Sequence, residues 1–213
     1  KTVSISPEMV EKHKDLKIVY TPIHGTGIKL IPAALRAFGF TNITNVPEQD
    51  VVSGNFPTVI SPNPEEPAAM KMAMEKGKAI DADVVMASDP DADRIGVAVK
   101  NDKGEFVILN GNQTALVFIY YIISKRKESG KLKTNDFIVK PIVTTELIAK
   151  IAQQNHVEYF DVFTGFKFIA EVIRDFEGQK DYIGGGEESF GFMPASFVRD
   201  KDAVSSCALM AEI

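Results

Sequence analysis

Short apolar runs alternate along this chain with longer segments in which apolar residues recur at helical spacing. Val84–Ala87 is an apolar run typical of a buried strand, and Ile95, Val97 and Val99 alternate with smaller residues. The other expected strands are Leu16–Tyr20, Asn42–Val46, Glu105–Leu109, Phe137–Val143 and Val157–Phe163. The expected helices are Ile28–Phe38, Pro64–Lys78, Gly111–Glu128, Glu146–Gln154, Phe166–Phe176 and Ala203–Ile213.

This alternation of strands and helices occurs twice, which predicts an α/β protein with two consecutive domains. Each domain is expected to hold a mixed, mostly parallel sheet flanked by helices. The hairpin turn Asn101–Gly104 marks the expected boundary, so the predicted domains are residues 1–104 and 105–213. A chain of 213 residues is long enough for one large domain or two small ones.

An acidic loop between two of the expected strands carries the clearest chemical signal. Asp89, Asp91 and Asp93 stand at every second position of this loop, where their charges repel one another if left unpaired. Clustered oxygen ligands favour a hard cation such as Mg²⁺, and the adjacent Arg94 could take a phosphate oxygen beside it. The alternative is a solvated acidic turn. Three carboxylates at this spacing, flanked by buried strands, favour the metal site.

A second polar loop is expected at Gly184–Gly191. Its glycines, Gly186 among them, let the backbone approach a ligand closely. Glu187 and Glu188 offer hydrogen-bond acceptors to the hydroxyl groups of a sugar, and Ser189 offers a donor. The alternative is a glycine-rich strand end with solvated glutamates. The acidic loop elsewhere in the same chain favours sugar recognition.

Three basic side chains have two interpretations each. His24, in the strand-to-helix turn Thr21–Gly27, is either an anion contact or a packed histidine with satisfied ring nitrogens. Lys167 begins an expected helix, where the helix dipole disfavours a cation, so it has a function or simply extends to the surface. Lys201 lies among other charged residues. For each lysine taken alone, the surface interpretation is the default.

Composition limits the classes of function. The net charge of −5 argues against a nucleic-acid surface, and no segment approaches the run of apolar residues that a membrane helix needs. The single cysteine, Cys207, rules out an internal disulfide and fits a reducing compartment, so a cytoplasmic location is expected. The N-terminus lacks a signal-peptide pattern. Both ends look like cuts, and we expect a piece of a longer protein.

The loop Asp89-Pro90-Asp91-Ala92-Asp93-Arg94 resembles the metal loop of the α-D-phosphohexomutases, the phosphoglucomutase/phosphomannomutase family. The Gly-Glu-Glu-Ser segment within Gly185–Gly191 extends the resemblance, and the two loops together are specific to this family. Supporting segments are Thr21–Gly27, Thr164–Phe168 and Arg199–Asp202. These enzymes have four domains, and nearly all of this chain looks like the second and third.

The resemblance implies a Mg²⁺-dependent transfer of a phosphoryl group between positions 1 and 6 (or 5) of a sugar phosphate. In the family, a phosphoserine donates its phosphate, and a sugar bisphosphate forms, reorients and returns phosphate to the serine. The implied metal ligands are Asp89, Asp91 and Asp93, with Arg94 contacting phosphate and Glu187, Ser189 and Gly186 in the sugar-binding loop. His24 is a further substrate-contact candidate, Lys201 matches a family lysine near the reacting sugar, and Lys167 is a weaker catalytic candidate.

Two parts of a phosphohexomutase do not occur in this sequence. These are the Ser-His-Asn-Pro segment that supplies the phosphoserine and the Arg-x-Ser-Gly-Thr segment of the fourth domain. We therefore expect the N- and C-terminal domains of the same protein as partners, and no mutase activity from this chain alone. Pro90 and the Gly-Glu-Glu-Ser-Phe-Gly form favour the branch with phosphoglucomutases and phosphopentomutases over bacterial phosphomannomutases. The alternatives are a non-catalytic metal- or sugar-binding module and a Mg²⁺-dependent sugar phosphatase.

Overall fold

A computed structural model describes residues 3–213 and divides them into two compact units. The first unit comprises residues 3–109 and the helix Ala203–Glu212, and the second comprises Asn110–Asp202. The predicted α/β class, with two units built on mixed sheets, is confirmed. The domain limits 1–104 and 105–213 stay a prediction, and the last helix packs with the first unit.

The first unit contains a five-stranded sheet in the order β2-β1-β3-β4-β5. Its strands are β1 (Ile18–Thr21), β2 (Ile43–Asn45), β3 (Val84–Ser88), β4 (Ile95–Lys100) and β5 (Phe106–Ile108). Its helices are α1 (Pro7–Lys12), α2 (Gly27–Phe38), α3 (Pro67–Ile80) and α7 (Ala203–Glu212). β1 pairs in parallel with β2 and β3, whereas β3–β4 and β4–β5 pair antiparallel. This sheet is therefore evenly mixed, and the expectation of a mostly parallel sheet is wrong here.

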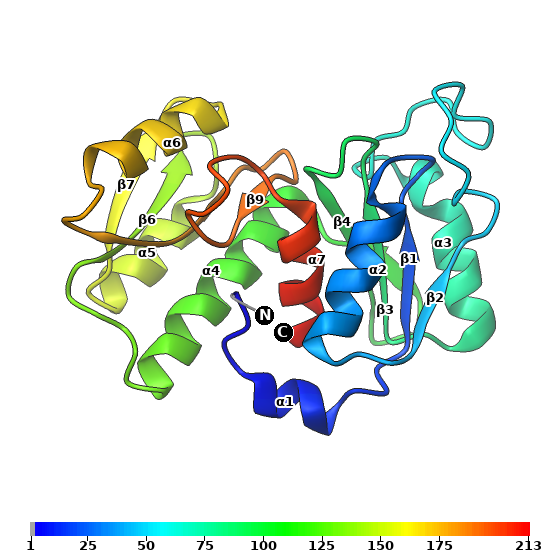
Figure 1. The fold of residues 1–213 in the computed structure, drawn as a ribbon, viewed down its shortest axis with the longest axis horizontal. Coiled ribbons are helices and arrows are strands. Elements are labelled where there is room, and N and C mark those ends of the chain that lie inside the picture. The colour runs from blue at the N-terminus through cyan, green and yellow to red at the C-terminus, as the bar shows by residue number, and fades with distance from the viewer. Residues whose placement is uncertain (1–2) are drawn as a thin grey trace. The chain divides into compact units, whose positions relative to one another are not determined.

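Helices cover both faces of this first sheet. Figure 1 shows α2 and α7 side by side on one face and α3 on the other. α3 buries Ala69, Met70 and Ala73 against the sheet core, because these small or flexible apolar side chains share one face of the helix. β1 and β3 are buried along their whole lengths, as strands covered on both faces must be. The result is a rigid frame for the loop that leaves β3.

The second unit contains a four-stranded sheet in the order β7-β6-β8-β9. Its strands are β6 (Asp136–Pro141), β7 (Glu158–Val162), β8 (Asp181–Gly186) and β9 (Phe192–Met193). Its helices are α4 (Gly111–Glu128), α5 (Glu146–Gln154) and α6 (Phe166–Asp175). β6 pairs in parallel with β7 and β8, and only β8–β9 is antiparallel, so this sheet is mostly parallel as predicted.

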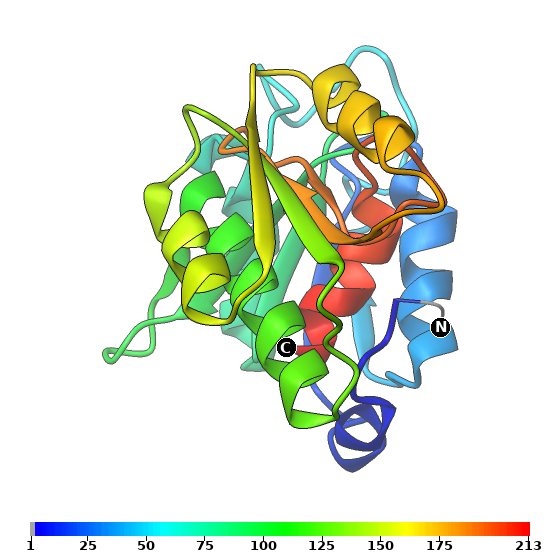
Figure 2. The same cartoon turned by 90° about the vertical axis from the view of Figure 1, so that its left-hand side faces the viewer.

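In the second unit α4 and α5 cover one face of the sheet and α6 covers the other (Figures 1 and 2). The α6 face is closed by an aromatic core in which Phe137 contacts the rings of Phe160, Phe176 and Tyr182 edge-on. The expected loop Gly184–Gly191 is shorter than predicted, because β8 continues through Gly186. In residues 3–213 no helix combines the length and the apolar character that crossing a membrane requires.

The carboxylate of Glu212 ties the last helix to the start of the first unit. It accepts hydrogen bonds from the backbone N–H groups of Ile5 at 2.7 Å and Ser6 at 2.9 Å, and from the Ser4 hydroxyl. Glu212→Ala leaves these donors without their acceptor in a largely buried place, so we expect a loss of about 2–4 kcal/mol in the free energy of unfolding. Urea denaturation of the variant and the wild type measures this difference in the free energy of unfolding.

The matched control is Glu75→Ala, which breaks an exposed ion pair with Lys71 on α3. Such pairs contribute less than about 1 kcal/mol, so the control should unfold close to the wild type. Equal midpoints for the two variants would contradict the role given to Glu212.

Candidate functional site

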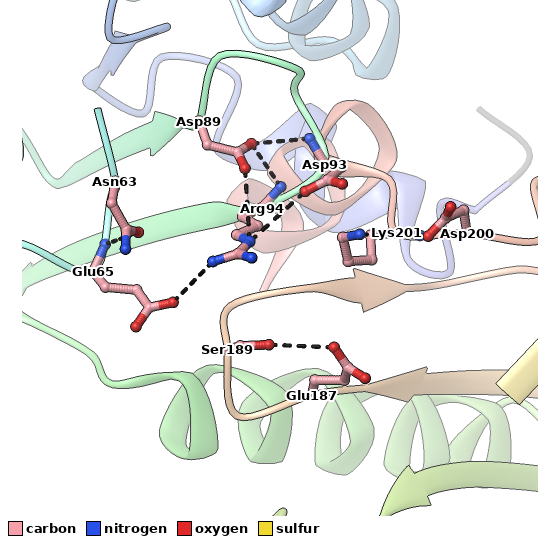
Figure 3. Close-up of polar contacts among 9 residues, drawn as sticks. All are labelled: Asn63, Glu65, Asp89, Asp93, Arg94, Glu187, Ser189, Asp200 and Lys201. Atoms are coloured by element: carbon pink, nitrogen blue, oxygen red, sulfur yellow. Dashed lines mark hydrogen bonds and ion pairs between the residues drawn. The ribbon is translucent and has the colours of Figure 1, made fainter. Parts of the chain in front are cut away.

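The acidic loop forms a compact turn between β3 and β4. The Asp89 Oδ1 atom accepts the backbone N–H groups of Asp93 at 3.0 Å and Arg94 at 2.9 Å (Figure 3). Ala92 adopts a left-handed conformation, with φ of 62°, and its N–H donates to the Asp89 carbonyl at 3.1 Å. Asp89 thus shapes the loop, and its own backbone continues directly from a buried strand.

The three aspartates converge as the sequence predicts. One carboxylate oxygen from each of Asp89, Asp91 and Asp93 lies within 4.8 Å of the other two. Burial, together with the charges of Asp93 and Asp91, raises the pKa of the Asp89 carboxyl to about 7. A cation would relieve this repulsion, and an all-oxygen donor set suits a hard divalent ion. The residues present therefore fit Mg²⁺.

Arg94 faces carboxylates of its own unit. Its Nη1 atom lies 3.2 Å from Glu65 Oε1, and its Nε atom lies 3.7 Å from Asp89 Oδ2 and 3.9 Å from Asp93 Oδ1 (Figure 3). Glu65 itself is placed by a hydrogen bond from its N–H to Asn63 Oδ1 at 3.1 Å. The Arg94 side chain is 37% exposed, so it balances the acidic cluster while part of it stays accessible to a further anion.

The turn between β1 and α2 contacts the acidic loop and holds its backbone in place. The Thr26 N–H and hydroxyl both donate to the Pro90 carbonyl, at 2.8 and 3.0 Å. Gly25 permits this approach, because a Cβ at this position would lie 2.7 Å from the Pro90 oxygen and overlap the Pro90 Cα. The predicted Gly-containing turn is therefore a support for the acidic loop.

Gly25→Ala is expected to push the acidic loop away from this support. The clash is with backbone, so the structure cannot relieve it by a rotamer change, and we expect about 1–3 kcal/mol lower stability. Metal binding should weaken as well, which titration with Mn²⁺ measures. Gly54→Ala is the control, because a Cβ at Gly54 meets nothing within 4 Å. If both variants bound Mn²⁺ as the wild type does, the supporting role of Gly25 would be wrong.

His24 fits the packing alternative of the two that its sequence context left open. The ring is buried, with Nδ1 2.8 Å from the Val51 carbonyl and Nε2 2.8 Å from the Thr58 hydroxyl. Thr58 also accepts a hydrogen bond from Gln49 Nε2 at 3.2 Å. The histidine therefore fixes the loop that follows β2 through both ring nitrogens, and its contact with a substrate stays a prediction.

In the second unit, Glu187 organises the turn between β8 and β9. Its Oε1 atom accepts the Gly165 N–H at 2.7 Å. Its Oε2 atom accepts the Ser189 hydroxyl at 3.2 Å, as Figure 3 shows. The Glu187 N–H donates to the Gly191 carbonyl at 2.9 Å, which closes the turn. Phe190 takes a left-handed conformation with φ of 68°. Segments far apart in sequence, at Gly165 and Glu187, are thereby joined.

Gly186 and Gly191 allow close packing at the two ends of this turn, residues 187–190. A Cβ on Gly186 would lie 2.5 Å from the Phe192 ring, and one on Gly191 would lie 2.6 Å from the Lys201 Cδ atom. The stem of Lys201 thus runs along Gly191, beside the turn. The Lys201 ammonium lies 5.5 Å from the Phe166 ring centroid and 3.6 Å from Asp200 Oδ1.

Lys167 lies on the exposed side of α6, with its ammonium 4.9 Å from the Phe168 ring centroid. It borders a surface cavity of about 520 Å³ whose other charged lining residues are Glu171, Arg174 and Arg199. The structure thus places Lys201 against the turn that holds Glu187 and Ser189. It places Lys167 in the first turn of α6, close after Gly165 in the chain.

The residues that contact Glu188 and hold the turn at residues 187–190 were not identified from the sequence. A Cβ on Gly111, the first residue of α4, would overlap the Glu188 carbonyl oxygen and lie 2.5 Å from its carbon. The Thr144 hydroxyl donates to Glu188 Oε2 at 2.8 Å. A glycine inside the first helical turn was a visible signal for close approach. The pairing of Thr144 with Glu188 had no signal in the linear pattern.

Comparison with known proteins identifies both units. The model of phosphoglucomutase/phosphomannomutase alpha/beta/alpha domain II matches residues 3–104, and that of domain III matches residues 110–213. The phosphoglucomutase of Staphylococcus aureus (strain MRSA252) is 38% identical over 196 residues, which cover 92% of this chain and 35% of that protein. The chain therefore spans about a third of the length of the curated relatives it matches.

Solved structures show the same fold. A putative phosphomannomutase from Thermus thermophilus matches with a TM-score of 0.75 at 21% identity, over 97% of this chain and 45% of that one. The Aspergillus fumigatus N-acetylphosphoglucosamine mutase in complex with GlcNAc-6P and magnesium matches with a TM-score of 0.64 at 14% identity, over 99% and 49%.

Proposed function

Because this chain belongs to the phosphoglucomutase/phosphomannomutase family, as its second and third domains, we propose that it is the central part of a Mg²⁺-dependent phosphosugar mutase. The longer protein would move a phosphoryl group between positions 1 and 6 of a hexose phosphate, with glucose phosphate as the preferred substrate. Phosphomannomutase and phosphopentomutase activities are the nearest variants of this proposal.

The convergence of Asp89, Asp91 and Asp93 on one loop is the observation that carries the proposal. A phosphoryl group in transfer concentrates negative charge, and a bound Mg²⁺ ion neutralises that charge. In the proposal these three carboxylates hold the ion, and Arg94 offers its accessible face to a phosphate oxygen. The Aspergillus fumigatus mutase was solved in complex with magnesium, which is consistent with this interpretation of the loop.

The turn in the second unit is proposed to hold the sugar. Glu187 and Ser189 present a carboxylate and a hydroxyl from one short turn whose backbone is already fixed at both ends. A carboxylate and a hydroxyl can both hydrogen-bond to sugar hydroxyl groups. In the proposal they do so in either of the two orientations of the sugar. Lys201, packed along Gly191, is proposed to contribute a positive charge near the reacting sugar.

The phosphoserine donor and the remaining phosphate contacts would come from parts of the protein that this chain does not include. We therefore propose that the chain alone does not catalyse isomerisation and that a sugar bisphosphate is the intermediate of the complete enzyme. A cytoplasmic location is part of the same proposal, in keeping with the single, buried Cys207.

The proposal is tested on the protein with its native flanking sequence. Glucose-1-phosphate, mannose-1-phosphate and ribose-1-phosphate are each supplied with Mg²⁺ and a priming amount of sugar bisphosphate. We expect isomerisation of all reactive substrates to stop when the metal is chelated, with glucose-1-phosphate turned over fastest. A folded, serine-phosphorylated protein that isomerises none of them would contradict the proposal and leave a binding module.

A further inference from the structure

Lys140, on β6, is the only lysine or arginine with a fully buried side chain among residues 3–213. Its ammonium lies 2.9 Å from Glu146 Oε1 and 2.8 Å from Asp161 Oδ1. Burial acts to lower the pKa of Lys140, but hydrogen bonds to Asp161 and Glu146 outweigh it, so the pKa is raised. The amine therefore stays charged inside the second unit, although no step of the proposed reaction uses it.

The same ammonium also holds the turn that follows β6. It donates to the Thr144 carbonyl at 3.2 Å and to the Pro141 carbonyl at 3.4 Å. The Thr144 N–H in turn donates to the Pro141 carbonyl at 3.0 Å. A cation that binds both ends of a tight turn fixes the position of its backbone, and therefore of the buried Thr144 side chain.

Thr144 connects the turn after β6 to the turn at residues 187–190. Its hydroxyl donates to Glu188 Oε2 at 2.8 Å, and Glu188 directly follows Glu187. On the other side, the Glu188 carbonyl rests against Gly111 so closely that no side chain fits there. Glu188 is thus held by a hydrogen bond at its carboxylate and by steric contact at its backbone.

We propose that Lys140 and Thr144 are positioning residues of the sugar site. Lys140 orders the turn after β6, Thr144 holds the Glu188 carboxylate, and Glu188 holds Glu187 and Ser189 in the geometry that receives the sugar. This inference rests on the proposed function, since it assigns the turn to sugar binding. It adds that the geometry of the turn depends on a buried cation, Lys140, that lies outside the turn.

The test replaces Thr144 by valine in the complete protein, which removes the hydroxyl and keeps the side-chain volume. Misplacing a binding group by about 1 Å costs on the order of a hundredfold, so we expect kcat/KM to fall about 10- to 100-fold, mainly through KM. Thr144→Ser, which keeps the hydroxyl, should restore KM to within about twofold of the wild type.

Thr145→Val is the matched control. Thr145 is the neighbouring residue, and its hydroxyl caps α5 by accepting the Leu147 N–H at 3.3 Å. Losing this cap lowers stability without touching the turn at residues 187–190. The control should therefore lower the unfolding midpoint and leave KM unchanged, which separates positioning from general destabilisation.

A second readout does not depend on activity. Hydrogen exchange at the amide of Glu187, whose bond to the Gly191 carbonyl closes the turn, should become about tenfold faster in Thr144→Val and stay unchanged in Thr145→Val. An inactive wild type would overturn the proposed function alone, because the exchange comparison remains valid. Wild-type exchange in Thr144→Val would overturn the positioning role, whatever the activity.

Glu188→Ala breaks the same contact from the other side and serves if the valine variant fails to fold. Its exchange rate at Glu187 should rise as in Thr144→Val. Where both singles fold, the double variant should lose no more than the larger single variant, because both changes remove one interaction. Independent, additive effects would contradict the proposal.

Discussion

Asp91→Asn in the complete protein is expected to reduce Mg²⁺-dependent isomerisation by at least about a thousandfold. A bound metal supplies several kcal/mol of charge stabilisation in phosphoryl transfer, and about 4 kcal/mol corresponds to three powers of ten in rate. Asp91 is exposed, whereas Asp89 is buried and shapes the loop, so Asp91 tests the metal site without removing a structural contact. Steady-state kcat/KM at saturating Mg²⁺ measures the effect.

The stability of Asp91→Asn should equal or slightly exceed that of the wild type, because one of three mutually repelling charges is gone. Asp102→Asn is the control, since it removes one exposed charge from the turn after β4 in the same unit. Full activity in Asp91→Asn, or an equal loss in Asp102→Asn, would rule out the role given to the acidic loop.

Glu187→Gln is the second change with a large expected effect. The glutamine keeps the size of the side chain but has one acceptor oxygen where the carboxylate has two. It cannot accept both the Gly165 N–H and the Ser189 hydroxyl as Glu187 does. Hydrogen bonds to charged groups contribute about 1.5–3 kcal/mol, so we expect a loss of about a hundredfold in kcat/KM.

The comparison variant for Glu187 is Glu128→Gln, at the exposed end of α4 in the same unit. Glu128 forms a surface ion pair with Lys125 at 2.7 Å, and such pairs contribute little. Its kcat/KM should stay within about twofold of the wild type. An unchanged kcat/KM in Glu187→Gln would show that the turn does not bind the sugar.

The elements with strong local signals could be predicted from the sequence. The apolar runs at Val84–Ala87 and around Ile95 gave β3 and β4, and the loop between them was placed correctly. The six expected helices were found, two with the observed ends and four with ends displaced by one to three residues, because their apolar spacing is local information. The strand β8 was not predicted, since glycines weaken a strand pattern even where pairing with β9 extends the strand through Gly186.

Features that depend on partners far away in the chain were missed. The packing of helix α7 beside α2 could not be predicted, because nothing in its own sequence pattern indicates that partner. The even mixture of the first sheet arises from the hairpin pairing of β3, β4 and β5, which adds two antiparallel neighbours. Short helix α1 had no amphipathic pattern long enough to recognise.

The same distinction applies to the candidate site. The acidic loop and the Gly-Glu-Glu-Ser segment are continuous in sequence, so their chemistry could be inferred directly. Lys140 could not be recognised, because a lysine within a strand pattern is expected on an exposed face. Only the fold brings Asp161 and Glu146 to its ammonium and makes burial of the charge tolerable.

The most direct test of the central claim follows the phosphorus of glucose-1-phosphate by ³¹P NMR in the complete protein with Mg²⁺ and a priming sugar bisphosphate. We expect the substrate signal to be replaced by that of glucose-6-phosphate, with no accumulation of inorganic phosphate, and we expect Asp91→Asn to prevent the change. Inorganic phosphate as the main product would identify a phosphatase instead. An unchanged substrate signal from folded, serine-phosphorylated protein would contradict the mutase assignment.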